Sequence, residues 1–338
     1  MVKGRLSLLI LGRNVFFKKD RIHTTTIAVF LIFSLILYSC KKNATKSTAI
    51  IKTVAFVNKT NNTNHIWLMD IDDAGIGNNP RRLTDDTASE DYPTWSPDGK
   101  HILYQRGYNG SAIYIADSDG KNQIRLSPTP AFDVSPSWSP DGKKIVFSRL
   151  QGFIVPNQIP KTEIRVMNAD GTNDHLLLPS SDFSVEPRWS VTNQIVFMSH
   201  MNDLSGPLHI FTMNSDGTNI QQLTQTGNAG DPVWSPDGKQ ISFGSDREGN
   251  NKLNIFVMNA DGSNVRQLTH FTAPYESGDT NWSSDGTKII FEWDVNGQKQ
   301  SNPDAYAEVW TMNVDGTQQK STNQACSCVG AAPRWKPN

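Results

Sequence analysis

The chain has 338 residues, of which 32 are basic and 33 acidic, and its formal net charge is −1. Residues 1–40 hold six of the basic and one of the acidic side chains, so the rest of the chain has a net charge of −6. Surfaces that bind nucleic acid are strongly basic, and this balance therefore argues against a nucleic-acid partner.

Residues 1–40 have the organisation of a targeting segment. Lys18, Lys19 and Arg21 precede an apolar run over residues 27–38. This run is shorter than the about 20 residues that span a bilayer, but it suits the hydrophobic region of a signal peptide. The run ends in Ser39-Cys40, which resembles the lipobox of bacterial lipoproteins. An alternative is a short signal anchor in which Cys40 is incidental.

The lipobox resemblance implies that residues 1–40 are a lipoprotein signal peptide and that Cys40 receives the lipid. Residues 41–50 are polar and short, and we expect a flexible tether there. No aspartate follows Cys40 directly, so the known inner-membrane retention signal is absent. The resemblance thus predicts a periplasmic protein that is lipid-anchored to the outer membrane and contacts the membrane through its N-terminal lipid only.

Residues 51–338 contain a repeated unit, seen most clearly over residues 231–269. A strand that ends in Trp234 is followed by the turn Ser235-Pro236-Asp237-Gly238, with proline and glycine where a type I turn accepts them. A second strand follows around Phe243, then a third over residues 255–258, an Asp-Gly turn and a short fourth strand. The tryptophan recurs at Trp95, Trp138, Trp189, Trp234, Trp282 and Trp335.

Four strands in a repeat of 43 to 53 residues predict a β-propeller, in this case an all-β protein with six blades. The first copy lacks a tryptophan strand, whereas the chain ends in a tryptophan strand, around Trp335, with nothing after it. We therefore expect the C-terminal strand to dock on the N-terminal blade beside Phe56. This arrangement closes a ring of six antiparallel, four-stranded blades without open edges.

The repeat Pro-x-Trp-Ser-Pro-Asp-Gly-Lys, followed by Ile-x-Phe, Met-Asn-x-Asp-Gly and Leu-Thr, resembles the propeller repeat of TolB and its relatives. Two copies differ, because Val191-Thr192-Asn193 replaces Pro-Asp-Gly and Ser284 replaces one proline. Members of the TolB group carry an α/β domain before the propeller that meets the inner-membrane partner, and residues 1–50 leave no room for it. The resemblance therefore predicts the architecture more strongly than the function.

The sequence has no motif for a nucleophile elbow, a zinc helix or a phosphate-binding loop, and we expect neither catalysis nor a cofactor or metal. Cys326 and Cys328 are separated by one residue, which favours free thiols over a strained bridge. Oligogalacturonate lyases use a related repeat with a histidine-bound metal. His200 and His270 are the candidates for that alternative.

The loops on one rim are long and unequal, and loops of this kind usually carry binding function. Glu186, Asp231 and Asp279 stand three residues before a tryptophan, and Asp91 stands four before, so we expect an acidic channel mouth. Two structural alternatives stay open. The carboxylates could accept backbone N–H groups, or they could pair with arginines near the ends of second strands: Arg106, Arg149 and Arg247.

Phe153 lies in an apolar loop that either folds over a neighbouring blade or forms a contact patch. Together with Trp293 and the four carboxylates, Phe153 completes the candidate partner-binding set. The resulting hypothesis is a monomeric, non-enzymatic envelope propeller that binds a protein or peptidoglycan-associated partner. A carbohydrate- or small-ligand-binding propeller is the first alternative, favoured by rim aromatics: Tyr92, Tyr108, Phe153, Trp293 and Tyr306. A metal-dependent lyase is the second.

Overall fold

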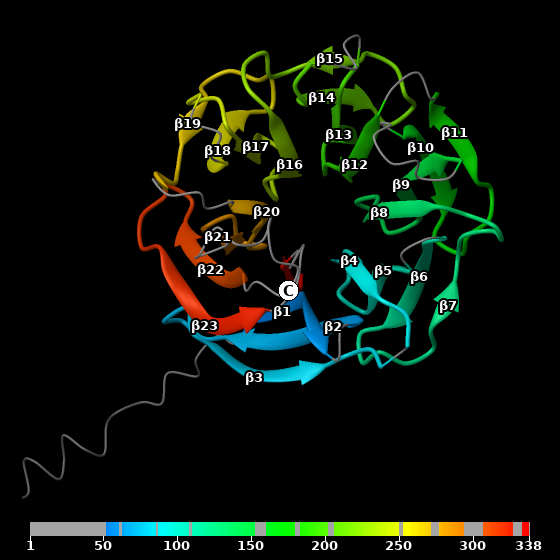
Figure 1. The fold of residues 1–338 in the computed structure, drawn as a ribbon, viewed down its shortest axis with the longest axis horizontal. Helices are drawn as coiled ribbons and strands as arrows, with labels where there is room; N and C mark the ends of the chain where they lie inside the picture. Colours follow the sequence, from blue (N-terminus) through cyan, green and yellow to red (C-terminus); the bar gives the residue numbers. More distant parts are fainter. Residues whose placement is uncertain are drawn as a thin grey trace, which may run out of the picture. The chain divides into compact units, whose positions relative to one another are not determined.

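The computed structural model describes residues 52–60, 63–85, 87–107, 110–152, 160–179, 183–201, 206–249, 253–271, 277–293, 307–326 and 333–337. The signal peptide, the tether, Cys40 and Phe153 lie outside these residues. Within them, six four-stranded antiparallel sheets stand around a central axis (Figure 1). The predicted six-bladed all-β propeller is therefore confirmed. The described part of the chain has no helix long and apolar enough to cross a membrane.

The first three blades are built from the N-terminal half of the chain and the last strand. Blade 1 has the order β24 (Arg334–Trp335), β1 (Lys52–Thr60), β2 (Thr63–Ile71) and β3 (Gly77–Arg82). Blade 2 contains β4 (Glu90–Trp95), β5 (His101–Arg106), β6 (Ala112–Asp117) and β7 (Ile124–Arg125). Blade 3 contains β8 (Asp133–Trp138), β9 (Lys144–Gln151), β10 (Lys161–Asn168) and β11 (His175–Leu178).

The other three blades follow in chain order. Blade 4 contains β12 (Ser184–Trp189), β13 (Gln194–Ser199), β14 (His209–Asn214) and β15 (Gln221–Gln222). Blade 5 contains β16 (Ala229–Trp234), β17 (Gln240–Ser245), β18 (Asn254–Asn259) and β19 (Arg266–Gln267). Blade 6 contains β20 (Ser277–Trp282), β21 (Lys288–Trp293), β22 (Ala307–Asn313) and β23 (Lys320–Cys326).

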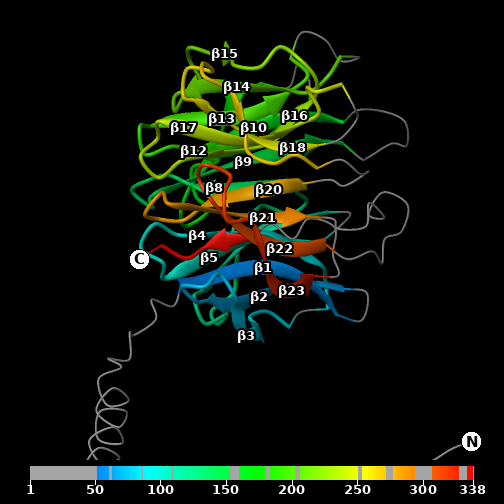
Figure 2. The same cartoon turned by 90° about the vertical axis from the view of Figure 1, so that its left-hand side faces the viewer.

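The C-terminal strand closes the ring as expected. In β24, Trp335 is the register partner of Val54 in β1, and the Lys336 N–H donates to the Thr53 carbonyl at 2.8 Å. The red C-terminal strand thus completes the blue N-terminal blade in Figure 1, and Figure 2 shows the C-terminal end on one face of the ring. Closure gives β1 a partner on its inner side, where an unpaired edge would invite pairing with another chain.

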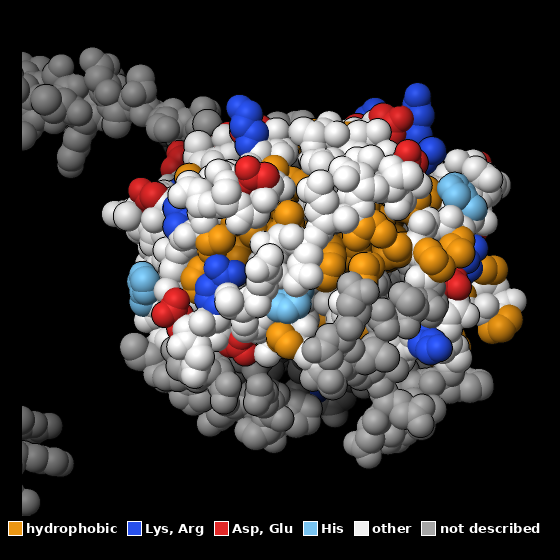
Figure 3. All heavy atoms as spheres, turned by 90° about the horizontal axis from the view of Figure 1, so that it is seen from above, with side chains coloured by type: hydrophobic (Ala, Val, Ile, Leu, Met, Phe, Trp, Pro, Cys, Tyr) orange, Lys and Arg blue, Asp and Glu red, His pale blue; other side chains and the backbone are white. Residues whose placement is uncertain are grey.

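The core is assembled from one aromatic side chain per blade and the apolar strands beside it. The second strands place buried rings at one repeat position: Phe56, Tyr104, Phe147, Phe197, Phe243 and Phe291. The third strand of blade 5 is buried at Asn254–Met258, as expected for a strand covered on both faces. When the ring is viewed from its edge, the surface shows hydrophobic side chains in separate groups among polar ones (Figure 3).

The tight turns keep their geometry even where the sequence departs from the repeat. The Gly238 N–H donates to the Ser235 carbonyl at 2.9 Å, and Gly286 makes the same bond to Ser283 at 2.8 Å. In blade 4 the Asn193 N–H donates to Ser190 at 3.0 Å, and Asn193 adopts a φ of 63°. Asparagine tolerates this left-handed conformation better than most residues, which is why the altered turn still closes.

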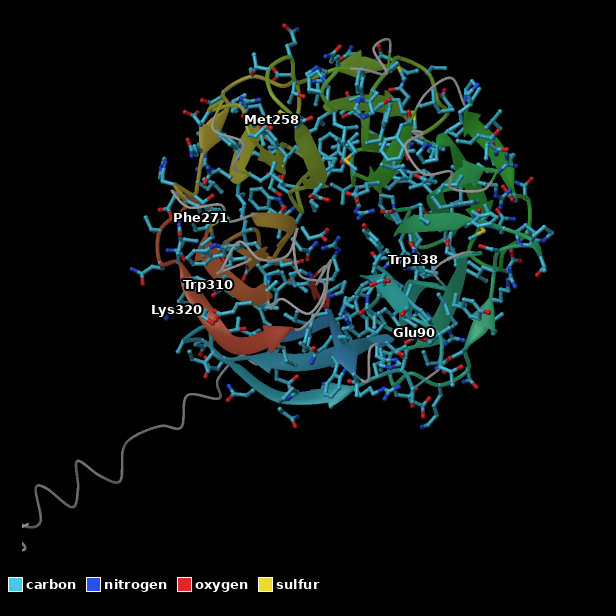
Figure 4. All side chains as sticks on the ribbon, in the orientation of Figure 1. Glu90, Trp138, Met258, Phe271, Trp310 and Lys320 are labelled. Carbon is cyan, nitrogen blue, oxygen red and sulfur yellow. The ribbon has the colours of Figure 1, made fainter. Side chains whose placement is uncertain are left out.

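The repeated tryptophans join neighbouring blades. Trp138 Nε1 donates to the Thr94 carbonyl at 3.4 Å, so an indole from blade 3 bonds the residue just before the tryptophan of blade 2. Trp95, Trp234 and Trp282 make the same type of bond to the preceding blade. Trp189 differs, because its Nε1 donates to Asn193 Oδ1 at 3.1 Å in its own turn. Figure 4 shows Trp138 on the inner side of its blade.

Candidate functional site

The innermost strands share a bulge three residues before each tryptophan. The register shifts there in five blades, and the residue at this position has a positive φ between 41° and 55° in each: Tyr92, Ser135, Glu186, Asp231 and Asp279. Left-handed backbone is uncommon for residues other than glycine. Because a bulge re-aims a side chain, its recurrence in five blades indicates a built-in feature of the channel wall.

The bulges bring acidic side chains from different blades together. Glu186, Asp279, Asp231 and Asp91 all raise the pKa of the half-buried Tyr92 hydroxyl, with Glu186 contributing most. The four carboxylates come from blades 4, 6, 5 and 2, so the only place they can converge is the channel axis. Each inner strand runs from the rim with the long loops to the rim with the tight turns. The cluster residues precede the tryptophan of their strand, so the cluster lies nearer to the loops than the tryptophans do. The structure thus brings the four predicted carboxylates together, and their role in partner binding stays a prediction.

The carboxylates of this cluster are poorly solvated and repel one another. Burial, followed by the charges of Asp231 and Asp279, raises the pKa of Glu186 well above its ordinary value. Burial and Asp279 likewise raise the pKa of Asp231. Burial raises the pKa of Asp91 to about 6, although the Asn64 Nδ2 donates to its carboxylate at 2.9 Å. Such shifts are typical of sites that exchange protons or bind cations.

Glu186 has an unsatisfied atom. The residue is 5% exposed, and its Oε2 is buried without a hydrogen-bond partner in the described part of the chain. A buried carboxylate oxygen without a partner is costly, and a donor supplied from outside would stabilise it.

The structural alternative in which these carboxylates pair with Arg106, Arg149 and Arg247 is wrong. Arg106 Nη2 lies 2.8 Å from Glu90 Oε1, and Arg149 Nε lies 2.6 Å from Asp133 Oδ1. The Arg247 guanidinium lies over the Phe243 and Phe256 rings instead, at 5.3 and 5.1 Å. Within the acidic cluster, Asp279 pairs with a different cation, the Arg334 Nη2 at 3.4 Å.

Glu90 and Asp133 were not among the predicted site residues. Both have fully buried side chains, and both stand five residues before a tryptophan. The sequence feature that could have predicted these pairs was this shared repeat position, together with an arginine near the end of the next strand. Figure 4 shows Glu90 near the boundary of blades 1 and 2. These pairs are structural, because each arginine is paired with a carboxylate of its own blade.

Trp293 belongs to an aromatic cluster and not to the acidic one. Its ring stacks on Phe271 at 4.4 Å and meets Trp310 edge-on at 4.4 Å. Trp310 Nε1 in turn donates to Glu308 Oε2 at 2.8 Å. Figure 4 shows Phe271 and Trp310 on the same side of the ring. Of the other rim aromatics, Tyr92 lies in the channel, whereas Phe153, Tyr108 and Tyr306 lie outside the described residues.

The two histidines of the lyase alternative belong to different blades. His200 follows β13 and has an unpartnered Nδ1, and exposed His270 follows β19. Among the residues that the structure describes, no group of three or more His, Cys, Asp or Glu side chains is arranged to hold a metal ion.

Fold and channel together define a six-bladed β-propeller whose axial channel is acidic toward the loops. The chain belongs to the TolB beta propeller domain family, whose profile matches residues 50–152 and 149–338. No curated protein matches the sequence.

Solved structures agree on the fold. TolB from Acinetobacter baumannii is 19% identical, with a TM-score of 0.66 over 92% of this chain and 72% of that one. A structure assigned to TolB of Agrobacterium tumefaciens is 20% identical, with a TM-score of 0.61 over 85% and 99%. An oligogalacturonate lyase in complex with manganese is 15% identical, with a TM-score of 0.56 over 79% and 73%.

Proposed function

We propose that this chain is a non-enzymatic, lipid-anchored envelope propeller that binds a protein or peptidoglycan-associated partner through its loop-bearing rim. The observation that carries the proposal is the convergence of Asp91, Glu186, Asp231 and Asp279 from four blades at one end of the channel. At a pH at which these carboxylates are ionised, a narrow mouth lined by them focuses negative potential. It therefore suits a partner that presents a cationic segment.

The unpartnered Glu186 Oε2 strengthens this proposal. A lysine or arginine side chain of the partner would donate to this oxygen and offset the mutual repulsion of the carboxylates. Such charge-assisted hydrogen bonds are about twice as strong as neutral ones. Membership of the TolB propeller family supports a binding role, and the periplasmic address follows from the same kinship and from the lipobox-like sequence.

The test replaces the carboxylates by neutral isosteres. In the variant Glu186→Gln, Asp231→Asn, Asp279→Asn, a labelled lysine-rich peptide should lose its binding, and capture of proteins from envelope extracts should fall. Wild-type binding should weaken with salt, because the screening length is about 8 Å near 0.15 M. Fluorescence anisotropy at two salt concentrations measures both effects.

A matched control removes the same charge elsewhere. Asp170, Asp216 and Asp261 stand in exposed turns, where each accepts a backbone N–H that an asparagine oxygen can also accept. Changing these three to Asn should leave peptide binding at the wild-type level. If the channel variant captures the same proteins with the same yield, or fails to fold, these carboxylates are structural and the proposed site is refuted.

The proposed lipid anchor has an independent test. Cys40→Ala should abolish metabolic labelling by a fatty acid, because the thiol is the proposed attachment point. Unchanged labelling would overturn the anchor without affecting the channel.

The stacked cluster of Phe271, Trp293 and Trp310 favours carbohydrate binding as a second candidate function. Aromatic faces supply apolar contact area to a ligand that also forms hydrogen bonds. Oligosaccharide titration of the wild type and of Trp310→Ala, followed by tryptophan fluorescence, decides this point. A response that Trp310→Ala does not change would exclude the cluster.

A further inference from the structure

The channel has a second mouth on the side of the tight turns. A pocket of about 260 Å³ lies there, and its wall includes the residue just before the tryptophan of every blade: Thr94, Ser137, Arg188, Val233, Asn281 and Arg334. Because one residue from each of the six blades lines it, the pocket must lie on the channel axis. The indoles of Trp95, Trp138, Trp189 and Trp234 also line it.

The charge of this pocket is opposite to that of the loop-side mouth. Its lining residues include two arginines and no acidic residue. Arg188 Nη1 contacts only the backbone carbonyls of Ser135 and Pro187, at 3.4 and 3.3 Å, and Arg188 has no ion pair in the described part of the chain. Arg334 is 5% exposed and holds Asp279 at 3.4 Å. Arg188 is therefore a cation that no carboxylate contacts directly, although its charge acts on Glu186 and Asp231 and lowers the pKa of both.

The two guanidinium groups lie close to each other. Burial lowers the pKa of Arg334, the negative charge of Asp279 partly offsets this, and the positive charge of Arg188 lowers the pKa further. Lys336 adds a third cation near this mouth, with its Nζ 5.1 Å from the ring centre of Trp95. Like charges held together repel, and an anion between them would relieve the repulsion.

The polar groups of the pocket offer donors. Asn281 Oδ1 accepts the Trp335 backbone N–H at 3.0 Å, which leaves the Nδ2 of the same amide as a donor. The acidic residues of the surrounding turns are occupied locally. In the turn of blade 2, for example, Asp98 Oδ1 accepts from Ser96 Oγ at 2.6 Å and from the Lys100 N–H at 3.1 Å. The mouth thus combines positive charge, donors and aromatic surface.

Blade 4 contributes most of what is unusual here. It supplies Arg188, Trp189 and Val191, and all three line the pocket. It is also the blade whose turn lacks Pro-Asp-Gly and whose indole bonds Asn193 instead of the neighbouring blade. The backbone N–H of Trp189 donates to Ser137 Oγ of blade 3 at 3.2 Å, but its half-buried indole makes no hydrogen bond to that blade and stands beside Arg188.

We propose that this turn-side pocket binds the carboxylate of a small organic anion, with Arg188 and Arg334 receiving its oxygens and the surrounding indoles contacting its apolar part. Arginine suits this role because its planar fork matches the two oxygens of a carboxylate. At about 260 Å³ the pocket is slightly smaller than the roughly 300–1,000 Å³ of typical ligand sites, so it takes a small molecule or the end of a longer one.

The proposal is tested on the mature chain by intrinsic tryptophan fluorescence and calorimetry, because four indoles line the pocket. The probes are benzoate, its neutral analogue benzamide, and a tripeptide with either a free or an amidated C-terminus. Benzoate should bind saturably and benzamide should not. Binding of the free-carboxyl tripeptide but not of its amide would assign the site to a peptide C-terminus, whereas binding of benzoate alone would assign it to small free acids.

Substitution locates the site. Arg188→Gln should weaken binding at least about tenfold, the loss expected when one charge-assisted hydrogen bond to a carboxylate is removed. The control Arg125→Gln changes an arginine on the outer strand β7 and should bind as the wild type does. No saturable binding of any carboxylate, or equal binding by Arg188→Gln and the wild type, would overturn the proposal.

The two mouths respond in opposite directions to one variant. Neutralising Glu186, Asp231 and Asp279 removes negative potential behind the arginines, so at pH 8 it should tighten carboxylate binding severalfold while abolishing cation binding at the loop side. Arg188→Gln should leave the lysine-rich peptide bound. The turn-side proposal and the loop-side function can therefore fail separately.

Discussion

The indole Nε1 of Trp95 donates to the backbone carbonyl of Arg334 at 3.3 Å, although 239 residues separate the two in sequence. This bond links the last strand of the chain to the second blade. It repeats the indole-to-carbonyl bond that joins other neighbouring blades, for example Trp138 to Thr94. On the side of blade 2 the seam of the ring thus has the same contact as the continuous part, whereas the Trp335 Nε1 is buried without a hydrogen-bond partner in the described part of the chain.

Removal of the Trp335 side chain should open this seam. Trp335 is 6% exposed and packs in a core cluster that joins residues of blades 6, 1 and 2, so Trp335→Ala should lower the free energy of unfolding by about 3–5 kcal/mol. Trp189→Ala is the matched control, and it should cost clearly less because its indole is only half-buried. Urea denaturation measures both. Equal losses would contradict the special role of the seam, and a chain ending at residue 330 should aggregate or lose cooperative melting.

The buried pair of Glu90 and Arg106 should be essential as a pair. Glu90 is fully buried and Arg106 is 11% exposed at its side chain, so Glu90→Leu leaves a buried cation with its ion pair broken and should cost about 3–5 kcal/mol. The double variant Glu90→Leu, Arg106→Leu removes both charges and should be more stable than the single one. A double-mutant cycle measured by thermal denaturation checks this. Additive losses would show that the two charges do not interact.

Glycine in the Asp-Gly turns is required for packing as well as for conformation. A Cβ at Gly120, where φ is 82°, would lie 2.2 Å from the Leu83 carbonyl oxygen of the neighbouring blade. Gly152 has nearly the same φ, 84°, but such a Cβ would have no atom of the described residues within 4 Å. Gly152→Ala should therefore cost about 1–2 kcal/mol, the backbone penalty, and Gly120→Ala should cost about 1–3 kcal/mol more. Thermal melts that show equal losses would refute the packing argument.

The acidic mouth should make stability depend on pH. The pKa of Asp91 is about 6 in the folded protein against an ordinary value of 3.8. Below pH 3.8 both states hold the proton. As pH rises from 3.8 to 6, the unfolded state loses it first, so the contribution of Asp91 to stability falls by up to about 3 kcal/mol and stays low above pH 6.

Asp91→Asn should remove this loss. The asparagine oxygen can still accept the Asn64 amide, so the variant should be more stable than the wild type at pH 7.5 and its advantage should disappear near pH 3.5. Urea denaturation at the two pH values measures the difference. A variant less stable than the wild type at pH 7.5 would show that the charged carboxylate stabilises the fold.

The sequence by itself determined the architecture. Turn residues such as Ser235-Pro236-Asp237-Gly238 set the turn geometry through local interactions. A tryptophan that recurs every 43 to 53 residues has the repeat length of a propeller blade. The missing strand at one end and the extra strand around Trp335 at the other were enough to predict closure. The altered turn at Val191-Thr192-Asn193 was also predictable, because an asparagine can replace the glycine in a left-handed position.

Only the tertiary structure decided which side chains meet. Repeat position placed Glu186, Asp231 and Asp279 in one ring, but it did not show that Arg106 and Arg149 pair with Glu90 and Asp133, which stand two positions earlier in the repeat. The bulge reverses which side chains face the channel. Its left-handed backbone occurs at residues as different as Tyr92, Ser135 and Asp231, so residue type does not predict it. Arg188 and Arg334 are 146 residues apart in sequence and meet only because the closed ring brings six strand ends to one axis.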